Sequence, residues 1–201
     1  MIFHSFIILL FACLQSIGSS QSPVRVNVTI AYESLCPDSK RFFHKQFVPT
    51  FNRLSNYMNV KFLPFGNELI SRLPSKVKFE CQHGPNECYR NKIQACFIAY
   101  DGNTTNQVKF INCAFDVKKA KKHVENCFDD ENFHSKIKHC ADGIMGDELL
   151  LKTGLETPAH SFIPWIVING KSGKNFNKRA FEHFMNVICD ELRADKPDEC
   201  K

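Results

Sequence analysis

The sequence predicts one α/β domain that carries a helical insertion held together by disulfide bonds. Three observations lead to this fold class. Patterns for a strand, a helix and a second strand follow one another over residues 24–65. Six cysteines fall among helical patterns between residues 81 and 140. Strand and helix patterns return after residue 161, so the cysteine-rich stretch divides an α/β unit into two halves.

The first 20 residues are predicted to be a signal peptide that is absent from the mature protein. They contain a largely apolar run and no charged residue, and small residues at Gly18 and Ser20 suit cleavage after Ser20. Cleavage would leave a domain over residues 21–201 with nine of the ten cysteines. Because nine is odd, at least one thiol cannot pair within the chain. Retention of the first segment as a signal anchor is the alternative.

The first half is predicted to be a βαβ unit. Apolar and polar residues alternate over residues 24–30, which is typical of a strand. A helix is expected from Pro37, which suits a first helical turn because it lacks an N–H. Pro49 is expected to kink or interrupt this helix. A second strand over residues 60–65 completes a parallel unit with a right-handed crossover.

The middle of the chain, residues 80–155, is predicted to be the helical insertion. Apolar residues recur at helical spacing over residues 89–100, 117–127 and 133–151. Cys81, His83 and Cys88 could supply zinc ligands. The oxidising environment of an exported protein favours disulfides instead, so no metal is predicted. Eight cysteines are predicted to form four disulfides, with Cys189–Cys200 as the single pair that proximity favours: Cys81, Cys88, Cys96, Cys113, Cys127, Cys140, Cys189 and Cys200.

The second half is predicted to contain a strand, a hairpin and a helix. Residues 161–169 have strand character and end in Asn169-Gly170, which is typical of a hairpin turn. A short strand over residues 174–176 is expected to complete the hairpin. Phe181, Phe184, Met185 and Ile188 then lie at helical spacing on one last helix.

Composition excludes several classes of protein. The net charge is +5 and the pI is near 8.6, below the value of about 9 that is typical of nucleic-acid-binding domains, so no nucleic acid is predicted as a partner. Apart from the first segment, no apolar run reaches the roughly 18 residues of a membrane span. Asn27 and Asn103 begin Asn-x-Thr triplets, which predicts glycosylation in a secreted or lysosomal protein.

Two motifs resemble one protein family. The stretch from Cys81 to Cys96 reads Cys-Gln-His-Gly-Pro-Asn-Glu-Cys-Tyr-Arg-Asn and ends in a further cysteine, and Cys36-Pro37-Asp38-Ser39 is followed far along the chain by Ile163-Pro164-Trp165. These residues are similar to the signature of the gamma-interferon-inducible lysosomal thiol reductase family. The resemblance spans residues 24–200 and implies a thioredoxin-like fold and reduction of protein disulfides in host defence.

The sequence departs from the family pattern at one position of the active site. The family has Cys-x-x-Cys, whereas this chain has Ser39 at the second position. Cys36 is therefore predicted to act as a single thiol, with an external thiol such as cysteine or glutathione as reductant and no bound cofactor. The alternatives are a catalytically weak family member that binds proteins in immunity, and a Cys36 that pairs within the chain.

The resemblance also assigns the residues around Cys36. A helix N-terminus should favour the thiolate, although Asp38 opposes it. Pro164 is implied to be the cis-proline that faces the thiol, and Pro37, Asp38, Ile163 and Trp165 are predicted to line the substrate groove. Trp165 in the core is the alternative. The expected partners are disulfide-containing proteins or a binding partner. A monomer is expected, with a dimer linked through Cys36 as the alternative.

Overall fold

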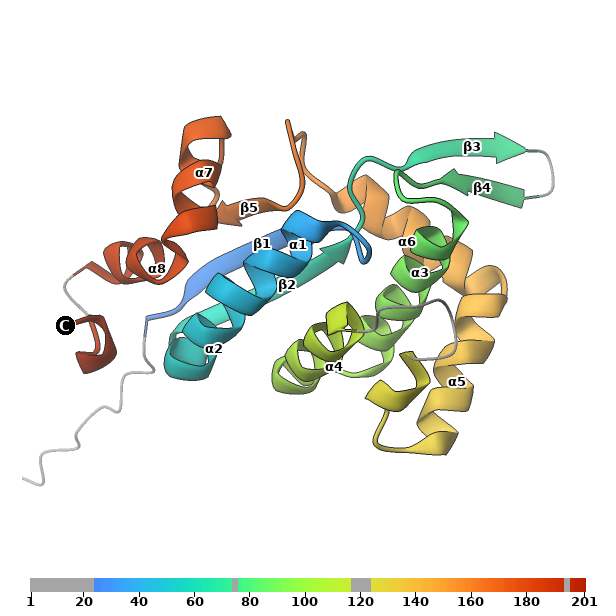
Figure 1. Ribbon diagram of the computed structural model, residues 1–201, viewed down its shortest axis with the longest axis horizontal. Helices are drawn as coiled ribbons and strands as arrows, with labels where there is room; N and C mark the ends of the chain where they lie inside the picture. Colours follow the sequence, from blue (N-terminus) through green and yellow to red (C-terminus); the bar gives the residue numbers. More distant parts are fainter. Residues whose placement is uncertain (1–23, 74–75, 117–123, 194–195) are drawn as a thin grey trace, which may run out of the picture.

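The computed structural model of the protein describes residues 24–73, 76–116, 124–193 and 196–201 (Figure 1). The predicted signal peptide over residues 1–20 lies outside the described residues. The strands and helices follow in this order: β1 (Val26–Tyr32), α1 (Pro37–Phe42), α2 (Val48–Leu54), β2 (Met58–Pro64), β3 (Leu69–Leu73), β4 (Lys76–Glu80), α3 (Pro85–Tyr100), α4 (Thr104–Asp116), α5 (Glu131–Asp142), α6 (Ile144–Glu156), β5 (Trp165–Ile168), α7 (Lys174–Glu182) and α8 (Phe184–Leu192).

A three-stranded sheet in the order β2–β1–β5 forms the centre of the molecule. β1 pairs with β2 in parallel, from Val26 opposite Met58 to Tyr32 opposite Pro64, which confirms the predicted βαβ unit. β5 pairs with β1 in the antiparallel sense. Figure 1 shows the sheet between α7 and α8 on one side and the helices α3 to α6 on the other.

One helical segment with a widened turn connects β1 to β2. α1 ends at Phe42, a π-helical turn covers Phe43–Phe47, and α2 begins at Val48. The interruption predicted at Pro49 therefore lies directly before this residue. A proline offers no N–H to the helical ladder and its ring crowds the preceding turn, and a π turn accommodates both effects.

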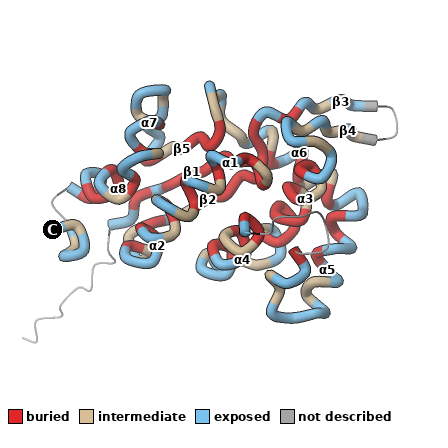
Figure 2. The backbone as a smooth tube through the Cα atoms, in the orientation of Figure 1, coloured by how far each residue is buried: buried red, intermediate tan, exposed pale blue. Residues whose placement is uncertain are grey.

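An aromatic core lies between this helical segment, the sheet and α8. It is centred on Phe42, Phe43, Phe47 and Phe184, which are fully buried. The ring of Phe47 lies 5.2 Å from that of Phe43 and 5.8 Å from that of Phe184, measured between centroids. Aromatic pairs at these separations add to the free energy of burial. In Figure 2 buried residues lie along β1 and β5 at the middle of the molecule.

The insertion contains a β-hairpin and helices α3 to α6. α3, α5 and α6 confirm the predictions over residues 89–100 and 133–151, with a break at Gly143 in the second. The hairpin of β3 and β4 and the helix α4 were not predicted. Of the helix predicted over residues 117–127, residues 117–123 lie outside the described residues, and Val124–Cys127 form one 3-10 turn.

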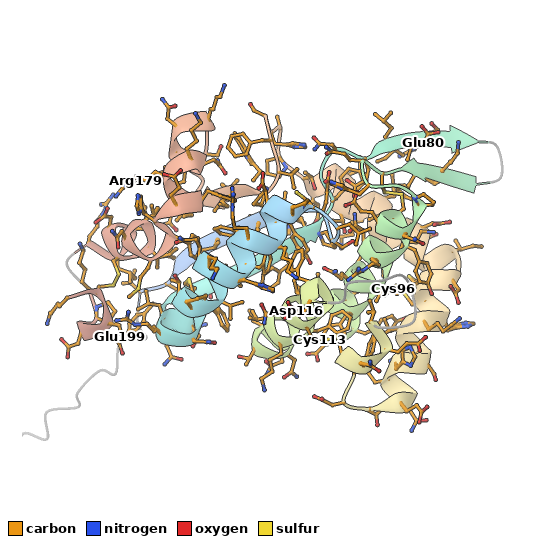
Figure 3. The ribbon with its side chains drawn as sticks, in the orientation of Figure 1. Glu80, Cys96, Cys113, Asp116, Arg179 and Glu199 are labelled. Carbon is orange, nitrogen blue, oxygen red and sulfur yellow. A yellow bond between two sulfur atoms is a disulfide. The ribbon has the colours of Figure 1, made fainter. Side chains whose placement is uncertain are left out.

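Four disulfide bonds involve the eight cysteines predicted to pair. Figure 3 labels Cys96 and Cys113, which lie on the helical insertion. The C-terminal pair is the one that sequence proximity favoured, and the Arg53 guanidinium of α2 also donates to the Glu199 carbonyl, at 3.0 Å, near this pair. The four bonds are Cys81–Cys88, Cys96–Cys140, Cys113–Cys127 and Cys189–Cys200.

The strand predicted over residues 174–176 is wrong, because α7 begins at Lys174. Asn169 and Gly170 form the predicted tight turn, with φ of 49° and 76°, but pairing ends after one bridge, between Ile168 and Lys171. In place of a next strand, the Asn177 side chain of α7 accepts the hydrogen bond from the Ile166 N–H at the edge of β5. The predicted last helix is also divided, since His183 separates α7 from α8.

Candidate active site

Cys36 lies in the loop between β1 and α1 and faces the loop before β5. Its Sγ atom is 4.0 Å from the Ile163 carbonyl oxygen. The Ile163–Pro164 peptide bond is cis, which is the conformation that the resemblance implied. Cys36 is 9% exposed, and among the described cysteines it alone forms no disulfide. The alternative in which Cys36 pairs within the described chain is therefore wrong.

Ser39 is buried beneath the thiol. Its Oγ accepts a hydrogen bond from the Glu33 N–H at 3.3 Å, and the Cys36 N–H donates to the Glu33 carbonyl at 3.2 Å. Burial raises the pKa of the Cys36 thiol above its usual value, and hydrogen bonds from Ser39 and the Asp38 backbone only partly offset this effect. The expected thiolate-favouring shift is therefore wrong in direction, because desolvation outweighs the helix N-terminus.

A groove beside Cys36 contains part of the predicted substrate-binding set. Asp38 and Ile163 line it, and Pro37 is exposed next to Asp38. Trp165 does not line the groove. It is 4% exposed and packs with Ala31, Leu63 and Ile163 beneath the loop, so its place in the groove was predicted wrongly. The remaining lining residues come from α1, the loop before β5 and α7: Arg41, Phe162, Lys178, Phe181 and Glu182.

Side chains of α3 hold the other side of the Cys36 loop. Asn91 Oδ1 accepts a hydrogen bond from the Ser34 N–H at 3.0 Å, and Glu87 Oε2 accepts one from the Leu35 N–H at 3.2 Å. The Glu33 N–H donates to Ser39 and the Cys36 N–H donates to the Glu33 carbonyl, as described above. Together with the contacts to α3, these bonds give every backbone N–H of residues 33–36 an acceptor. The loop is therefore satisfied without water on its buried side.

A polar cluster lies between this loop and α3, and we define it as Glu33, Glu68, His83, Glu87 and Asn91. Glu33 and Glu87 are fully buried and Glu68 is 7% exposed. His83 Nδ1 lies 2.7 Å from Glu87 Oε2 and 3.5 Å from Glu33 Oε2. The Asn91 amide donates to Glu68. Two of the three carboxyl groups, those of Glu33 and Glu87, thus share the partly exposed His83, whereas Glu68 bonds to Asn91 and to the Gly66 N–H.

Burial makes two of these carboxyl groups hold their protons tightly. It raises the pKa of Glu68 to about 8, although the Gly66 N–H donates to this carboxyl group. It also raises the pKa of Glu33, against the hydrogen bond from the Asn67 N–H, and the nearby Glu87 raises it further. Carboxylates that share a desolvated site cannot all ionise without mutual repulsion. The cluster is therefore in its favoured state when it is partly protonated.

The cluster has the composition of a cation site, since ligand atoms of Glu33, His83 and Glu87 lie within 4.8 Å of one another. The hydrogen bonds oppose this assignment. Both oxygens of Glu87 already accept from the N–H groups of Leu35 and His83, and Glu33 Oε1 accepts from Asn67, so that Glu33 Oε2 is the one oxygen of this pair of residues without a hydrogen-bond donor. The zinc reading of Cys81 and Cys88 is excluded in this structure, because the two sulfurs are bonded to each other.

Residues 27–131 match the family model described as "Gamma interferon inducible lysosomal thiol reductase (GILT)". This match covers more than half of the 201 residues. The chain belongs to the GILT family. It is 33% identical over 180 residues to the gamma-interferon-inducible lysosomal thiol reductase of Carassius auratus, covering 87% of this chain and 72% of that protein. It is 34% identical over an alignment of 215 positions to GILT-like protein 1 of Drosophila melanogaster, covering 96% and 84%.

A solved structure is similar to this GILT family member in fold. The DsbA of Chlamydia trachomatis matches with a TM-score of 0.56 at 12% identity, covering 85% of this chain and 89% of the DsbA chain. Likeness at such low identity concerns the fold alone. It confirms the predicted thioredoxin-like fold, to which the disulfide-bonded helices α3 to α6 are added.

Sequence analysis missed most of the polar cluster of this GILT family member. The cysteine motif quoted for the resemblance contains His83, Glu87 and Asn91, but no role was given to Glu33, Glu68, Glu87 or Asn91. One signal was available, because His83, Glu87 and Asn91 are four residues apart and α3 places such residues on one face. No comparable pattern points to Glu68, which reaches the cluster from the turn after β2.

The predicted glycosylation sites differ in their surroundings. Asn103 is exposed in the loop before α4, where its Oδ1 accepts from the Asn106 N–H at 3.2 Å. Asn27 is exposed within the central strand, but its side chain accepts from Asn59 at 3.1 Å and its N–H donates to Asn169. Asn103 is therefore the more accessible glycan acceptor of the two.

Proposed function

We propose that this GILT family member is a thiol–disulfide oxidoreductase that reduces protein disulfides through Cys36 as its single reactive thiol. The observation that carries the proposal is the unpaired sulfur of Cys36, which lies 4.0 Å from the Ile163 carbonyl of the cis-proline loop. The names of the Carassius auratus and Drosophila melanogaster relatives support thiol reductase chemistry.

The reaction needs an external thiol because Ser39 stands at the second active-site position. The Cys36 thiolate attacks one sulfur of a substrate disulfide, so that a mixed disulfide forms and the other substrate sulfur leaves as a thiolate. One external thiolate then attacks the substrate sulfur of this mixed disulfide, and Cys36 leaves as the regenerated thiolate. The substrate is released with its sulfur bonded to the external thiol. A second external thiol reduces that product, so two external thiols become one disulfide.

The groove beside Cys36 fits a polypeptide substrate better than a small molecule. Phe162 and Phe181 supply apolar surface, whereas Arg41 and Glu182 supply charges of both signs. The Ile163 carbonyl lies 4.0 Å from the Cys36 sulfur, where an extended segment that carries a disulfide can pair with it. The substrate is therefore a protein with an accessible disulfide, and no nucleic acid or membrane span enters the scheme.

The polar cluster is compatible with work in an acidic compartment. Glu68, with a pKa of about 8, is protonated in its favoured folded state at neutral as well as at acidic pH. The location that we propose is lysosomal or secreted, which the names of the family and of its relatives support, with a role in host defence through breakdown of disulfide-bonded proteins. Free cysteine is the reductant we propose, with glutathione as the alternative. We propose a monomer, with a dimer linked through Cys36 as the alternative.

Reduction of a denatured disulfide-bonded protein at pH 4.5–5.5, with cysteine supplied, tests the proposal. Wild-type protein is expected to accelerate reduction, and Cys36→Ala to abolish the acceleration. Ser39→Cys restores the Cys-x-x-Cys spacing and should raise turnover by roughly tenfold or more when cysteine is limiting. Ser39→Ala is the matched control, because it alters the same buried position without adding a thiol. Equal rates for wild type and Cys36→Ala would refute the proposal.

One observation favours a second function, that of an immune protein-binding factor. The pKa of Cys36 is raised and the thiol is 9% exposed, which makes it a slow nucleophile at acidic pH. In this function the groove binds a partner without turnover. Partner binding that survives Cys36→Ser, together with no Cys36-dependent reduction, would establish this function in place of the first.

A further inference from the structure

The structure assigns Glu87 and Asn91 of α3 as positioning residues for the Cys36 thiol, an inference that rests on the proposed reductase function. The two side chains bind consecutive backbone N–H groups, those of Leu35 and Ser34, directly before Cys36. They thereby hold the loop so that its sulfur faces the Ile163 carbonyl of the cis-proline loop.

The spacing along α3 fits this task. Glu87 and Asn91 are four residues apart, so that both side chains project from one face of the helix. Each meets one of two neighbouring peptide groups. A loop whose consecutive N–H groups are both fixed has few alternative conformations for the residue that follows. The position of Cys36 is therefore decided from α3 as well as from α1.

The burial of these contacts makes them hard to replace. Glu87 and Asn91 are fully buried and Ser34 is 2% exposed. Ser34 also donates its hydroxyl to the Glu87 carbonyl at 3.4 Å. A buried N–H that loses its acceptor keeps the full penalty of desolvation. The loop cannot shift away from α3 without leaving such groups unpaired, so the contacts act as a directional restraint.

Each positioning side chain is itself held in place. Glu87 Oε1 accepts from the His83 N–H at 3.0 Å, and its Oε2 lies 2.7 Å from His83 Nδ1. The Asn91 amide donates to the buried Glu68. Both oxygens of Glu87 and the amide nitrogen of Asn91 are therefore occupied, which fixes the orientation of the atoms that bind the loop.

A disulfide closes the turn that carries His83. The Cys81–Cys88 bond spans the start of α3, and Gly84 adopts a φ of 86° at the N-cap and donates its N–H to the Cys81 carbonyl at 3.0 Å. Cys88 directly follows Glu87. This gives a physical role to the cysteine motif. Its disulfide bond and the three polar side chains at positions 83, 87 and 91 together hold the Cys36 loop in place.

Amide hydrogen exchange of the folded full chain tests the restraint directly. Glu87→Ala should accelerate exchange at Leu35, and Asn91→Ala at Ser34, each by roughly tenfold or more because the acceptor is lost. Glu87→Gln and Asn91→Asp retain an acceptor oxygen and should restore most of the protection. They also keep the test valid where an alanine variant fails to fold.

Tyr32→Phe is the matched control. The Tyr32 hydroxyl donates to Gln94 Oε1 of the same helix at 2.6 Å, in a buried contact that does not touch the loop. This variant should leave the Ser34 and Leu35 amides as protected as in the wild type. Exchange at these amides that is no faster in the alanine variants than in Tyr32→Phe would overturn the assignment.

A ratio of two Cys36 reaction rates tests the catalytic consequence. One rate is mixed-disulfide formation with a protein disulfide, and the other is alkylation by iodoacetamide, both measured with EDTA present. Both reactions need the thiolate, so their ratio cancels changes in thiolate population. The ratio should fall by roughly tenfold in Glu87→Ala and stay unchanged in Tyr32→Phe.

An unchanged ratio in Glu87→Ala would overturn the positioning role. If wild-type Cys36 were alkylated but formed no mixed disulfide, the proposed reductase function would fail instead. The exchange measurement would still decide whether Glu87 and Asn91 hold the loop, so the two failures can be told apart.

Discussion

The molecule buries two clusters of opposite chemistry. The aromatic core of Phe42, Phe43, Phe47 and Phe184 consists of hydrocarbon surface with no polar atom to satisfy. The polar cluster of Glu33, Glu68, His83, Glu87 and Asn91 consists of charge-bearing and amide groups that each need a partner. Tyr32 lies between them, because its ring packs 5.0 Å from that of Phe43 and its hydroxyl donates to Gln94 of α3, the helix that carries Glu87 and Asn91.

The difference separates stability from positioning. Apolar burial stabilises in proportion to area and has little directional preference. Buried carboxyl groups lose hydration and contribute little net stability, but their hydrogen bonds fix distances and angles. We therefore expect the aromatic core to determine how stable the fold is, and the polar cluster to determine how Cys36 is held and how stability varies with pH.

The largest expected effect on stability is from truncating a side chain of the aromatic core. Phe47→Ala should lower the free energy of unfolding by about 3–5 kcal/mol, because a fully buried ring leaves a cavity. Urea denaturation measures this loss. Phe47→Leu, which fills most of the space, should lose less. The difference in stability between pH 5 and pH 8 should be the same as in the wild type, and a changed difference would show that the two clusters are not separate.

The second largest expected effect is on how the free energy of unfolding varies with pH, and it comes from Glu68 of the polar cluster. The pKa of Glu68 is about 8 in the folded protein and 4.5 in the reference state. A raised carboxyl pKa means that the folded state binds the proton more tightly, so this stability is present at low pH and is lost as pH rises from 4.5 through 8.

Glu68→Gln should remove this dependence. We expect the difference in the free energy of unfolding between pH 5 and pH 8 to shrink by roughly 2–3 kcal/mol relative to the wild type. Urea titrations at both pH values measure it. Glu148→Gln, at an exposed position of α6, serves as control. An undiminished difference in Glu68→Gln would contradict the assignment of the pH dependence to this residue.

A smaller effect is expected where the polar cluster meets the cis-proline loop. A Cβ added at Gly66 would lie 2.6 Å from Glu33 Oε1 and 2.7 Å from Ile163 Cγ1. Gly66→Ala should therefore destabilise the protein by about 1–3 kcal/mol and slow mixed-disulfide formation. Gly102→Ala is the matched control, because no atom lies within 4 Å of a Cβ there. Equal stability of the two variants would show that the loop moves freely.

The smallest effect is at Tyr32, which lies between the two clusters. Tyr32→Phe keeps the ring in the aromatic core and removes the hydroxyl that binds Gln94. We expect a loss of about 1 kcal/mol in the free energy of unfolding, measured by urea denaturation, with unchanged reactivity of Cys36. A large fall in reactivity would place Tyr32 in the positioning machinery and blur the boundary between the two clusters.

The parts of the fold that were predicted depend on local patterns. β1 alternates apolar and polar residues, and Pro37 marks the start of α1, so the βαβ unit could be recognised from neighbouring residues alone. The strand expected over residues 174–176 failed for the opposite reason. The Ile166 N–H at the edge of β5 donates to the Asn177 side chain instead of to a neighbouring strand. No local pattern of the sequence shows that contact.

The candidate site divides in the same way. Cys36, Ser39 and Pro164 were recognised because their motifs are short and specific. The position of Trp165 was misjudged because burial depends on what packs above it. The direction of the pKa shift of Cys36 was misjudged because desolvation depends on the whole surroundings of the thiol, whereas a helix N-terminus can be read from a few residues.

The sequence by itself determined that nine cysteines follow residue 20, that Cys36 is followed by Ser39 where the family has a second cysteine, and that the fold is thioredoxin-like with an insertion. Only the tertiary structure decided which of the eight other cysteines pair with one another, and that three buried carboxyl groups and an asparagine lie behind the Cys36 loop. The reason is physical. Composition and motif spacing are properties of the chain, whereas hydrogen bonds and desolvation arise when residues 33, 68, 87 and 91 are brought together by folding.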